Sequence, residues 1–329
     1  MAENKNVPTM KDVAREAGVA LGTVSKVVNG IPVGEEYRVR VEEAIKKLNY
    51  QINSYAKGFK SGKTMTVAVV MPNLVSPYFA LLTNCIQKAL AARYYQMIYY
   101  SSDYIPELEE KYIRMAEQQK VDGIICLSYY PKHVLPENLN VVFIDRYFGG
   151  KTPCVASDNY GGGWMAAEKL SELGCKNVAI LQIGSRLPHE PDKRRDGFLS
   201  ACQTLGLACE PCILHDGDPY QDFVDFLHSH CHDGKLDFDG LFCVTDALAY
   251  QIRGTLREMG LRVPEDVQMI GFDGIRHFGD LDYTCSTIVQ PVEVIAETCV
   301  DLVLRAPDSS APSLVCLPVS YAPGGTTRE

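Results

Sequence analysis

The sequence predicts a small all-α domain at the amino end, followed by a larger α/β body built from two doubly wound parallel sheets. Apolar residues recur at helical spacing through the first fifty residues. From Thr66 onward, short apolar runs alternate with amphipathic segments, and the alternation restarts after Gly163. A chain of 329 residues with 46% hydrophobic content is long enough for such separate cores.

Charge divides the chain at the same place. Residues 1–63 hold eleven lysine and arginine residues against seven aspartate and glutamate residues, a net charge of +4. The remaining residues hold 21 against 34, a net charge of −13. The overall charge of −9 therefore hides a basic head on an acidic body, and a basic head is compatible with nucleic-acid binding.

No segment is expected to direct export or to cross a membrane. Charged residues interrupt the amino end before an apolar run reaches signal-peptide length, and later runs such as 65–71 are too short for a bilayer. The twelve cysteines are spread singly through stretches that look buried, which favours reduced thiols over a disulfide scaffold. We expect a cytoplasmic protein.

The first predicted helix covers residues 10–17. Its apolar stripe consists of Met10, Val13, Ala14 and Ala17. Thr9 stands where an N-cap hydroxyl satisfies a free backbone amide, and Gly18 suits the left-handed backbone that reverses the chain. A second helix can then cross closely against the small Ala14 side chain.

A second helix over residues 21–29 has an apolar and a polar side. The apolar side carries Val24, Val27 and Val28, and the polar side carries Gly22, Thr23, Ser25, Lys26 and Asn29. After a loop with Pro32 and Gly34, a third helix closes a small core with Tyr37, Val41, Ala44, Ile45 and Leu48. We interpret this unit as a helix-turn-helix domain whose polar face meets a DNA groove; a plain helical hairpin is the alternative.

The body reads as two similar halves. The first half runs through T-V-A-V-V-M, a helix over 78–93, Q-M-I-Y-Y-S, a helix over 106–119 and D-G-I-I-C-L. The second half follows V-A-S-D-N-Y-G-G-G and contains V-A-I-L-Q, a helix around Phe198, G-L-F-C-V-T, a helix to Met259 and V-Q-M-I-G-F. The chain then crosses back near Gln290. This order predicts parallel sheets covered by helices on both faces.

Residues 7–29 closely resemble the start of the lactose/galactose repressor family. Their sequence is V-P-T-M-K-D-V-A-R-E-A-G-V-A-L-G-T-V-S-K-V-V-N. The resemblance extends to the C-terminal G-G-T-T-R and so covers nearly the whole chain. It implies a transcriptional repressor that binds double-stranded operator DNA as a homodimer and responds to a small effector, a sugar. It also implies a periplasmic-binding-protein-like body of two lobes joined by three crossing strands, with the effector between the lobes.

The resemblance assigns DNA contacts to the head. The implied contacts to base edges come from Leu21, Gly22 and Lys26. The implied contacts to phosphates or the local backbone come from Thr9, Thr23, Ser25 and Asn29. Two positions depart from the family, which usually has serine at Ala20 and arginine at Lys26. The phosphate contact of that serine and the fork-shaped guanine contact of that arginine are therefore not carried over to Ala20 and Lys26.

Residues 48–64 resemble the family's hinge helix, which folds on DNA and inserts an apolar wedge into the minor groove. Asn53, Tyr55, Ala56 and Phe59 are the implied contacts, with Asn53 as the cap and Phe59 in place of the usual leucine. Ile52 stands where a proline is common. A plain linker is the alternative. The expected domains are 1–52, a hinge over 53–64, and 65–329, with one lobe from about 65–158 and 290–318 and the other from about 159–289 and 319–329.

Ligands of open α/β sheets lie beyond the carboxyl ends of strands, and this rule selects the candidate effector residues. Carboxylates, guanidinium groups and flat aromatic rings are the mixture that recognises a sugar. The candidates are Asn73, Ser76, Tyr78, Phe79, Asp145, Arg146, Asp158, Arg194, Asp246 and Asp273, with Tyr220 as an aromatic lid. The alternatives are ordinary core packing for the aromatic residues and structural salt bridges for the charged ones.

Three other chemistries were considered. A zinc site would need cysteine and histidine ligands at a known spacing. That spacing is not found among Cys209, Cys212 and the histidines between 215 and 232. Gly161-Gly162-Gly163 lacks the order of a phosphate-binding loop and better fits the start of a helix. Nucleophile-elbow and zinc-protease motifs are missing from the sequence, so we expect no enzyme, no cofactor and no metal.

Alternatives to the sugar-controlled repressor remain. A corepressor-type regulator would sense a nucleobase or a sugar phosphate and bind its operator more tightly with ligand. A transport-type sugar-binding protein would share the two-lobed body but would need an export signal and no basic head. A cytosolic sugar-binding protein or sugar-modifying enzyme with a helical appendage would keep its activity when residues 1–63 are removed.

Overall fold

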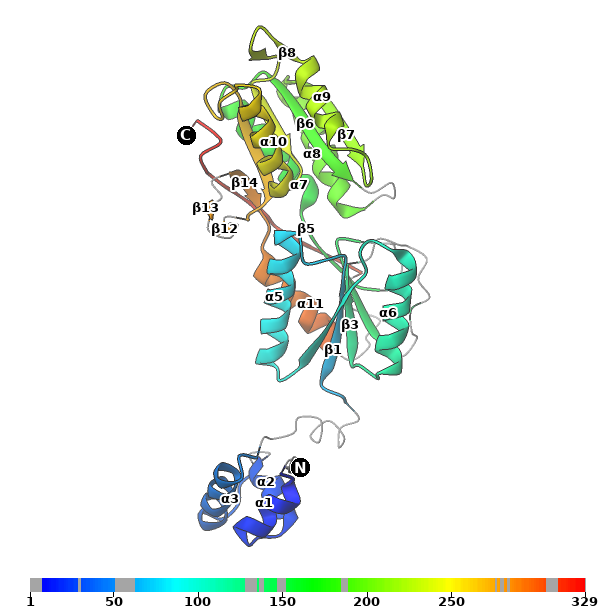
Figure 1. Cartoon of the computed structure of the whole chain (residues 1–329), viewed down its shortest axis with the longest axis vertical. Helices are drawn as coiled ribbons and strands as arrows, with labels where there is room; N and C mark the ends of the chain where they lie inside the picture. Colours follow the sequence, from blue (N-terminus) through cyan, green and yellow to red (C-terminus); the bar gives the residue numbers. More distant parts are fainter. Residues whose placement is uncertain are drawn as a thin grey trace, which may run out of the picture. The chain divides into compact units, whose positions relative to one another are not determined.

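The computed structural model describes residues 8–28, 31–50, 63–127, 135, 139–146, 152–184, 189–275, 277–278, 281–282, 285–305 and 313–328. The chain divides into two compact units, Met1–Lys63 and Thr64–Glu329 (Figure 1).

The first unit contains three helices, α1 (Met10–Ala17), α2 (Leu21–Val28) and α3 (Glu35–Lys47). Gly18 ends α1 with φ 60° and ψ 41°, the left-handed conformation expected of it, and this places α2 across α1. The core is small, and its fully or largely buried members are Val13, Ala14, Ala17, Val24, Val41, Ala44 and Tyr50. The predicted helix-turn-helix arrangement is confirmed, and the predicted last residue of the second helix, Asn29, lies outside the described residues.

The second unit contains two six-stranded sheets. The first has the strand order β15-β5-β4-β3-β1-β2, and all its strands are parallel. Its strands are β1 (Thr66–Met71), β2 (Gln96–Ser101), β3 (Gly123–Cys126), β4 (Asn140–Ile144), β5 (Cys154–Ser157) and β15 (Leu314–Leu317). Helices α5 (Pro77–Ala92) and α11 (Val292–Leu304) share a core with one face, and α6 (Pro106–Gln118) shares a core with the other.

Alternation along β1 explains the two cores. Val67, Val69 and Met71 belong to the core with α5 and α11, whereas Ala68 and Val70 belong to the core with α6. Successive side chains of a strand point to opposite faces, so an uninterrupted apolar run is what a sheet buried on both faces requires.

The second sheet repeats the arrangement with the order β16-β14-β11-β10-β6-β7. Its strands are β6 (Asn177–Gly184), β7 (Ala208–His215), β10 (Gly240–Cys243), β11 (Gln268–Asp273), β14 (Ser286–Val289) and β16 (Ser320–Ala322). Only the last pair, β14 with β16, is antiparallel. Helices α9 (Gln221–Ser229) and α10 (Asp246–Glu258) cover one face, and α7 (Asn159–Glu172) and α8 (Lys193–Leu205) cover the other.

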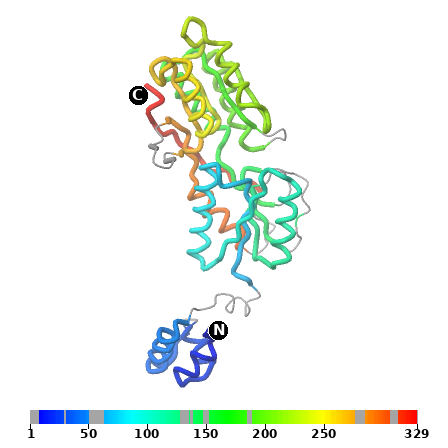
Figure 2. The backbone as a smooth tube through the Cα atoms, in the orientation of Figure 1, coloured from blue at the N-terminus to red at the C-terminus, as the bar shows by residue number. Residues whose placement is uncertain are grey.

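The chain crosses between the two sheets three times. It leaves the first sheet after β5, returns after β14 to form α11, and crosses again between β15 and β16. Figure 2 shows the second crossing as the orange segment that runs down beside the cyan α5, and helices α5 and α11 pack together there. The two-lobed body with three crossing strands is therefore present, as the sequence predicted.

Short elements complete the second unit. They are the 3-10 helix η1 (Glu190–Asp192) and two hairpins, β8 (Cys231–His232) with β9 (Lys235–Leu236) and β12 (His277–Phe278) with β13 (Leu281–Asp282). All twelve cysteines are free thiols, and most of them are buried, as their positions in apolar stretches suggested. Across the described residues, no helix is long and apolar enough to cross a membrane.

Candidate functional site

The exposed side of α2 is the first candidate site. Val24 faces the core with none of its surface exposed, whereas Leu21, Gly22 and Lys26 lie at the surface. Leu21 leaves 44% of its surface exposed, so its side chain is accessible to a partner. A side-chain carbon at Gly22 would meet no atom within 4 Å, so the backbone of this first turn is open to a partner.

The other predicted DNA contacts are less exposed or lie elsewhere. Thr23 and Ser25 are half-buried at the flanks of α2. Thr9 caps α1 at the surface, and its backbone amide and hydroxyl both donate to the carboxylate of Asp12, at 2.9 and 2.7 Å. Five of the predicted contacts lie outside the described residues: Asn29, Asn53, Tyr55, Ala56 and Phe59.

The second candidate site is a cavity of about 490 Å³ in the second unit, with lining residues from both sheets. Strand ends supply most of the lining, as the rule for open α/β sheets predicts. Nine of the predicted effector residues line it: Asn73, Ser76, Tyr78, Phe79, Asp145, Arg146, Arg194, Asp246 and Asp273.

Two predicted effector residues, Asp158 and Tyr220, do not line the cavity. Asp158 is the N-cap of α7, and its carboxylate accepts the backbone amide of Gly161 at 2.8 Å. The ring of Tyr220 packs against the core under α9, and its hydroxyl shares a hydrogen bond of 2.8 Å with Thr255. Local capping and core packing, respectively, account for these two residues.

Several lining residues were not predicted from the sequence. They are Tyr104, Gln182, His189, Asp216, Tyr250 and Gln251. Asp216 directly follows β7 and Tyr104 follows β2 by three residues, so the strand-end rule would have found both. Gln182 carried a different signal, because it is a polar residue at the end of the apolar run V-A-I-L.

Loop geometry holds several of these side chains in place. The side-chain oxygen of Asn73 accepts the amides of Val75 and Ser76 at 3.0 and 3.1 Å, which turns the chain into α5. Thr245 caps α10 through a 3.2 Å bond from the amide of Leu248 to its hydroxyl. The side-chain oxygen atoms of these loops therefore serve the backbone as well as the cavity.

Two cavity acids adopt backbone conformations that favour glycine. Asp145 has φ 54° and Asp273 has φ 127°. Non-glycine residues hold such conformations only where their surroundings determine them, and these positions cluster at functional sites.

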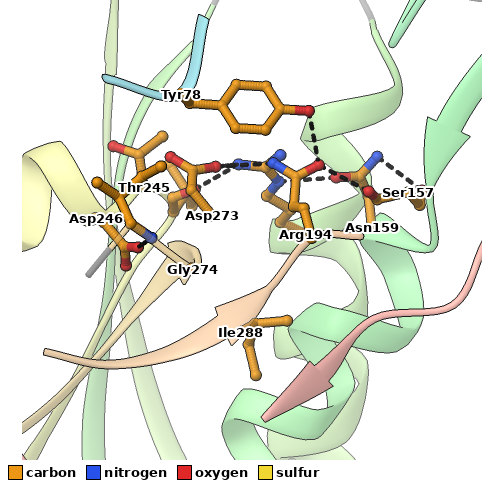
Figure 3. Close-up of polar contacts among 12 residues, drawn as sticks. Tyr78, Ser157, Asn159, Arg194, Thr245, Asp246, Asp273, Gly274 and Ile288 are labelled. Carbon is orange, nitrogen blue, oxygen red and sulfur yellow. Dashed lines mark hydrogen bonds and ion pairs between the residues drawn. The ribbon is translucent and has the colours of Figure 1, made fainter. Parts of the chain in front are cut away.

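A buried hydrogen-bond network connects the two sheets beside the cavity (Figure 3). The side-chain oxygen of Gln290 accepts from the Tyr78 hydroxyl at 3.1 Å and from the Ser157 hydroxyl at 2.7 Å. Its amide nitrogen donates to Asp273 at 2.8 Å. Tyr78 and Ser157 belong to the lobe of the first sheet and Asp273 to the second, so Gln290 joins the lobes at a crossing point.

Arg194 occupies the centre of the same network. Its Nε donates to Asn159 at 2.8 Å, and one terminal nitrogen donates to the carbonyl of Val244 at 2.7 Å and reaches Asp273 at 3.5 Å. The guanidinium also lies 3.7 Å above the ring centre of Phe272. Protein groups thus hold this buried cation through its Nε and one terminal nitrogen (Figure 3).

Burial shifts the carboxylates around the cavity toward their protonated forms. Burial raises the pKa of Asp273 to about 6, against the opposing effects of Arg194 and Gln290. Burial also raises the pKa of Asp145, which Arg194 and Arg146 oppose. For Asp246, burial and then the charge of Asp273 raise the pKa well above its ordinary range. Three acids that share one buried space therefore resist full ionisation.

The described part of the chain holds no group of three histidine, cysteine or acidic side chains that could bind a metal. The cavity contains a different set of groups: carboxylates and amides that accept hydrogen bonds, fixed guanidinium groups that donate them, and the rings of Tyr78, Phe79, Tyr104 and Tyr250. This set matches the hydroxyl groups and the apolar faces of a polyhydroxylated ligand.

Two family models match the chain. The one described as bacterial regulatory proteins, lacI family, matches residues 9–53. The one described as a periplasmic binding protein-like domain matches residues 167–327.

Individual proteins match over almost the whole length. The chain is 31% identical over 333 residues to the sucrose operon repressor of Pediococcus pentosaceus, covering 97% of this chain and 99% of that protein. It is 30% identical over 332 residues to the ribose operon repressor of Bacillus subtilis (strain 168), covering 98% and 99%. Its fold is similar to that of the Lac repressor bound to ONPG in the repressed state, with a TM-score of 0.79, 22% identity, and coverage of 98% and 100%.

Proposed function

Because the chain belongs to the lacI family of bacterial regulatory proteins, we propose that it is a cytoplasmic transcriptional repressor that a sugar releases from its operator. The observation that carries this proposal is the presence, in one chain, of a helix-turn-helix unit with an open α2 face and a cavity with sugar-binding chemistry. Binding, without a chemical step, is the proposed activity.

The DNA-binding role rests on the head. Its net charge of +4 favours approach to a phosphate backbone, although the whole chain is acidic. In the proposed complex α2 lies in the major groove, where Leu21, Gly22 and Lys26 reach base edges while Thr23 and Ser25 contact phosphates. A roughly palindromic operator and a homodimer follow from the two-fold symmetry with which such heads read DNA.

The effector role rests on the cavity and on the names of the relatives. The relatives described above are repressors of sucrose and ribose operons, which supports the control of carbohydrate-utilisation genes. Arg194 and Asp273 are the proposed central contacts, because both are buried, lie at strand ends or helix starts, and belong to one network. The rings of Tyr78 and Phe79 are proposed to cover an apolar face of the sugar.

We propose that the domains function as 1–52 for DNA, 53–64 as a hinge, and 65–329 for effector binding and dimerisation. Ligand in the cavity contacts both lobes and so favours one relative position of the two sheets. The Gln290 network at the crossing point carries that preference from one lobe to the other. Operator affinity and effector affinity are then linked, each lowering the other.

Selection of DNA fragments from the source genome tests the DNA-binding role. The purified full-length chain is incubated with sheared genomic DNA at a fixed salt concentration, and bound fragments are sequenced. We expect enrichment of a palindromic site beside carbohydrate-utilisation genes. A parallel selection with residues 64–329 alone should enrich nothing. Equal recovery of all fragments by the full-length chain would contradict the proposal.

A further inference from the structure

Gln182 is a buried polar side chain in an otherwise apolar strand. It lies at the carboxyl end of β6 with 2% of its surface exposed, and it lines the cavity. Val178 and Ile180, four and two residues earlier on the same face, belong to the core with α7 and α8. A glutamine at the next position of that face needs a reason other than packing.

Its orientation is fixed by Asp192. The amide nitrogen of Gln182 donates to Oδ1 of Asp192 at 2.9 Å, and Oδ2 of Asp192 accepts the backbone amide of His189 at 3.0 Å. An ionised carboxylate only accepts hydrogen bonds, so the NH₂ group of the glutamine must face it. The carbonyl oxygen Oε1 consequently points away from Asp192.

That carbonyl oxygen has no hydrogen-bond donor among the described residues, although it is buried. The same holds for Oδ1 of Asp145, whose residue is 4% exposed and lines the same cavity. Buried acceptors in folded proteins nearly always have a partner, from protein, water or ligand. Two orphan acceptors in one cavity indicate a ligand that supplies two donors.

The buried acidic lining disfavours one class of ligand. Four carboxylates line the cavity, those of Asp145, Asp216, Asp246 and Asp273, against the guanidinium groups of Arg146 and Arg194. Nε and one terminal nitrogen of Arg194 already donate to Asn159, Val244 and Asp273. A phosphate ester would bring nearly two negative charges into a space where burial already opposes the ionisation of carboxylates, and it would offer acceptors where Gln182 and Asp145 need donors.

We propose that Gln182 contacts the effector and that, together with Asp145, it selects an uncharged ligand with hydroxyl donors over phosphate esters of the same sugar. This inference rests on the proposed function, since it assumes that the cavity holds the effector. It makes Gln182, at the carboxyl end of β6, a determinant of ligand class.

Thermal unfolding of the full-length chain with matched pairs of ligands tests the selection. The pairs are D-glucose with D-glucose 6-phosphate, D-ribose with D-ribose 5-phosphate, and sucrose with sucrose 6-phosphate, extended by further uncharged mono- and disaccharides. We expect at least one uncharged sugar to raise Tm, with its phosphate ester binding at least about 100-fold more weakly by titration calorimetry. An ester that binds as tightly as its sugar would overturn the inference, and so would the absence of any uncharged ligand.

The same protein sample is tested for operator binding without ligand, which separates the two proposals. A chain that binds its operator but no uncharged sugar would leave the DNA-binding role standing and remove the assignment of ligand class. A chain that binds the sugar but no DNA would leave the assignment of ligand class standing and remove the DNA-binding role.

The variant Gln182→Met tests the residue itself, since methionine has nearly the same shape and no acceptor. We expect the affinity for the uncharged sugar to fall about 30-fold or more. Tm of the ligand-free protein should fall only slightly, because the exchange removes the 2.9 Å bond from Gln182 to Asp192 together with an unsatisfied buried acceptor. The control Gln203→Met makes the same exchange at an exposed position of α8 and should leave affinity unchanged.

Unchanged sugar affinity in Gln182→Met would overturn the inference. An equal loss of affinity for the sugar and for its phosphate ester would also overturn it, because Gln182 would then support the fold of the cavity and not the choice of ligand. Should that variant not fold, Asp145→Asn provides a second measurement. This substitution should weaken binding of the sugar and reduce the difference in affinity between the sugar and its phosphate ester. An unchanged difference in affinity would contradict the inference.

Discussion

Asp273 combines a buried carboxylate, a left-handed backbone and contacts with Gln290 and Arg194. Its pKa of about 6 exceeds the ordinary value of 3.8, so the folded chain binds this proton more tightly than the unfolded chain. Stability from this group is fully present below pH 3.8 and is lost as pH rises through about 6. The tighter binding of this proton by the folded chain corresponds to a free energy of about 3 kcal/mol.

The variant Asp273→Asn removes this titration. We expect the change in the free energy of unfolding between about pH 4 and about pH 7 to differ from the wild-type value by up to about 3 kcal/mol, measured by urea denaturation. Asp266→Asn is the control, because the pKa of the exposed Asp266 is lowered to about 2 by Arg262 and does not titrate in this window. An identical pH dependence for Asp273→Asn and the wild type would refute the raised pKa.

Lys26 is the basic residue on the exposed side of α2. If it contacts a base, Lys26→Ala should reduce the preference for the operator over random DNA by about 1–3 kcal/mol. Fluorescence anisotropy at fixed salt, with both DNAs, provides the measurement. An equal loss on both would instead assign Lys26 to the phosphate backbone.

Sequence patterns located most single residues of the cavity, but not all. Asp145 and Asp273 could be predicted because each stands at the carboxyl end of an apolar strand, where ligands of open α/β sheets bind. Asp158 follows β5 in the same way, yet it caps α7, and the sequence alone does not separate capping from ligand binding. The pairing of Gln182 with Asp192 depends on a fold contact across ten residues, which no local pattern reveals.

At the scale of elements, the close crossing of α7 and α8 depends on two glycines. A side-chain carbon at Gly163 would lie 1.9 Å from the carbonyl oxygen of Arg194, and one at Gly197 would lie 2.0 Å from that of Tyr160. Both contacts are with backbone, which cannot move aside independently. The glycines therefore set the helix separation that positions Arg194.

Gly163→Ala and Gly197→Ala should each destabilise the second unit by about 1–3 kcal/mol or more through overpacking, measured by chemical denaturation. Gly254→Ala is a matched control in α10, where a side-chain carbon meets nothing within 4 Å. That substitution should raise stability by about 0.5–1 kcal/mol. Similar effects of all three substitutions would show that the crossing does not require the glycines.

The start of β1 is tied to the turn after α6. Asp122 accepts the amides of Thr64 and Met65 at 2.9 and 2.8 Å, and the Thr64 hydroxyl donates to the carbonyl of Lys120 at 2.8 Å. This clamp fixes the first residues of the second unit, directly after Lys63.

Asp122→Ala should free the Lys63–Thr64 bond for proteolysis, since a protease needs an extended and mobile substrate. Limited trypsin digestion followed by mass spectrometry should show faster appearance of the fragment that begins at Thr64. Glu110→Ala, which removes a surface ion pair with Arg114 in the same lobe, is the control and should digest at the wild-type rate. An unchanged rate in Asp122→Ala would contradict the clamp.

Element positions followed from the sequence more closely than site residues did. Helices α1, α5 and α6 match their predicted ranges within one residue at each end, because a cap or a proline marks the start and the apolar stripe marks the rest. The edge strand β7 and the β8–β9 hairpin were not predicted as such, since the exposed edge strand β7 lacks a continuous apolar run. Their cysteines and histidines drew attention as possible metal ligands, but their spacing already argued against a zinc site.

At the scale of the whole molecule, opposite charges and separate cores divide the chain into a basic head and an acidic two-lobed body. Each lobe has its own pair of cores, so each can move as a unit, and the Gln290 network lies where the lobes meet. This organisation suits linkage between a ligand and a distant DNA site, because a ligand that contacts both lobes has differential affinity for their arrangements. The order of elements predicts the lobes, but the side chains that join them come together only in the fold.

Operator affinity as a function of sugar concentration tests this linkage most directly. The full-length chain is titrated onto its selected operator by fluorescence anisotropy, at fixed salt, without ligand and with saturating sugar; the phosphate ester of that sugar is the control. We predict that the sugar weakens operator binding at least about 10-fold, equivalent to about 1.4 kcal/mol of coupling, and that the ester has no effect. Operator affinity that is unchanged or higher with bound sugar would contradict the account.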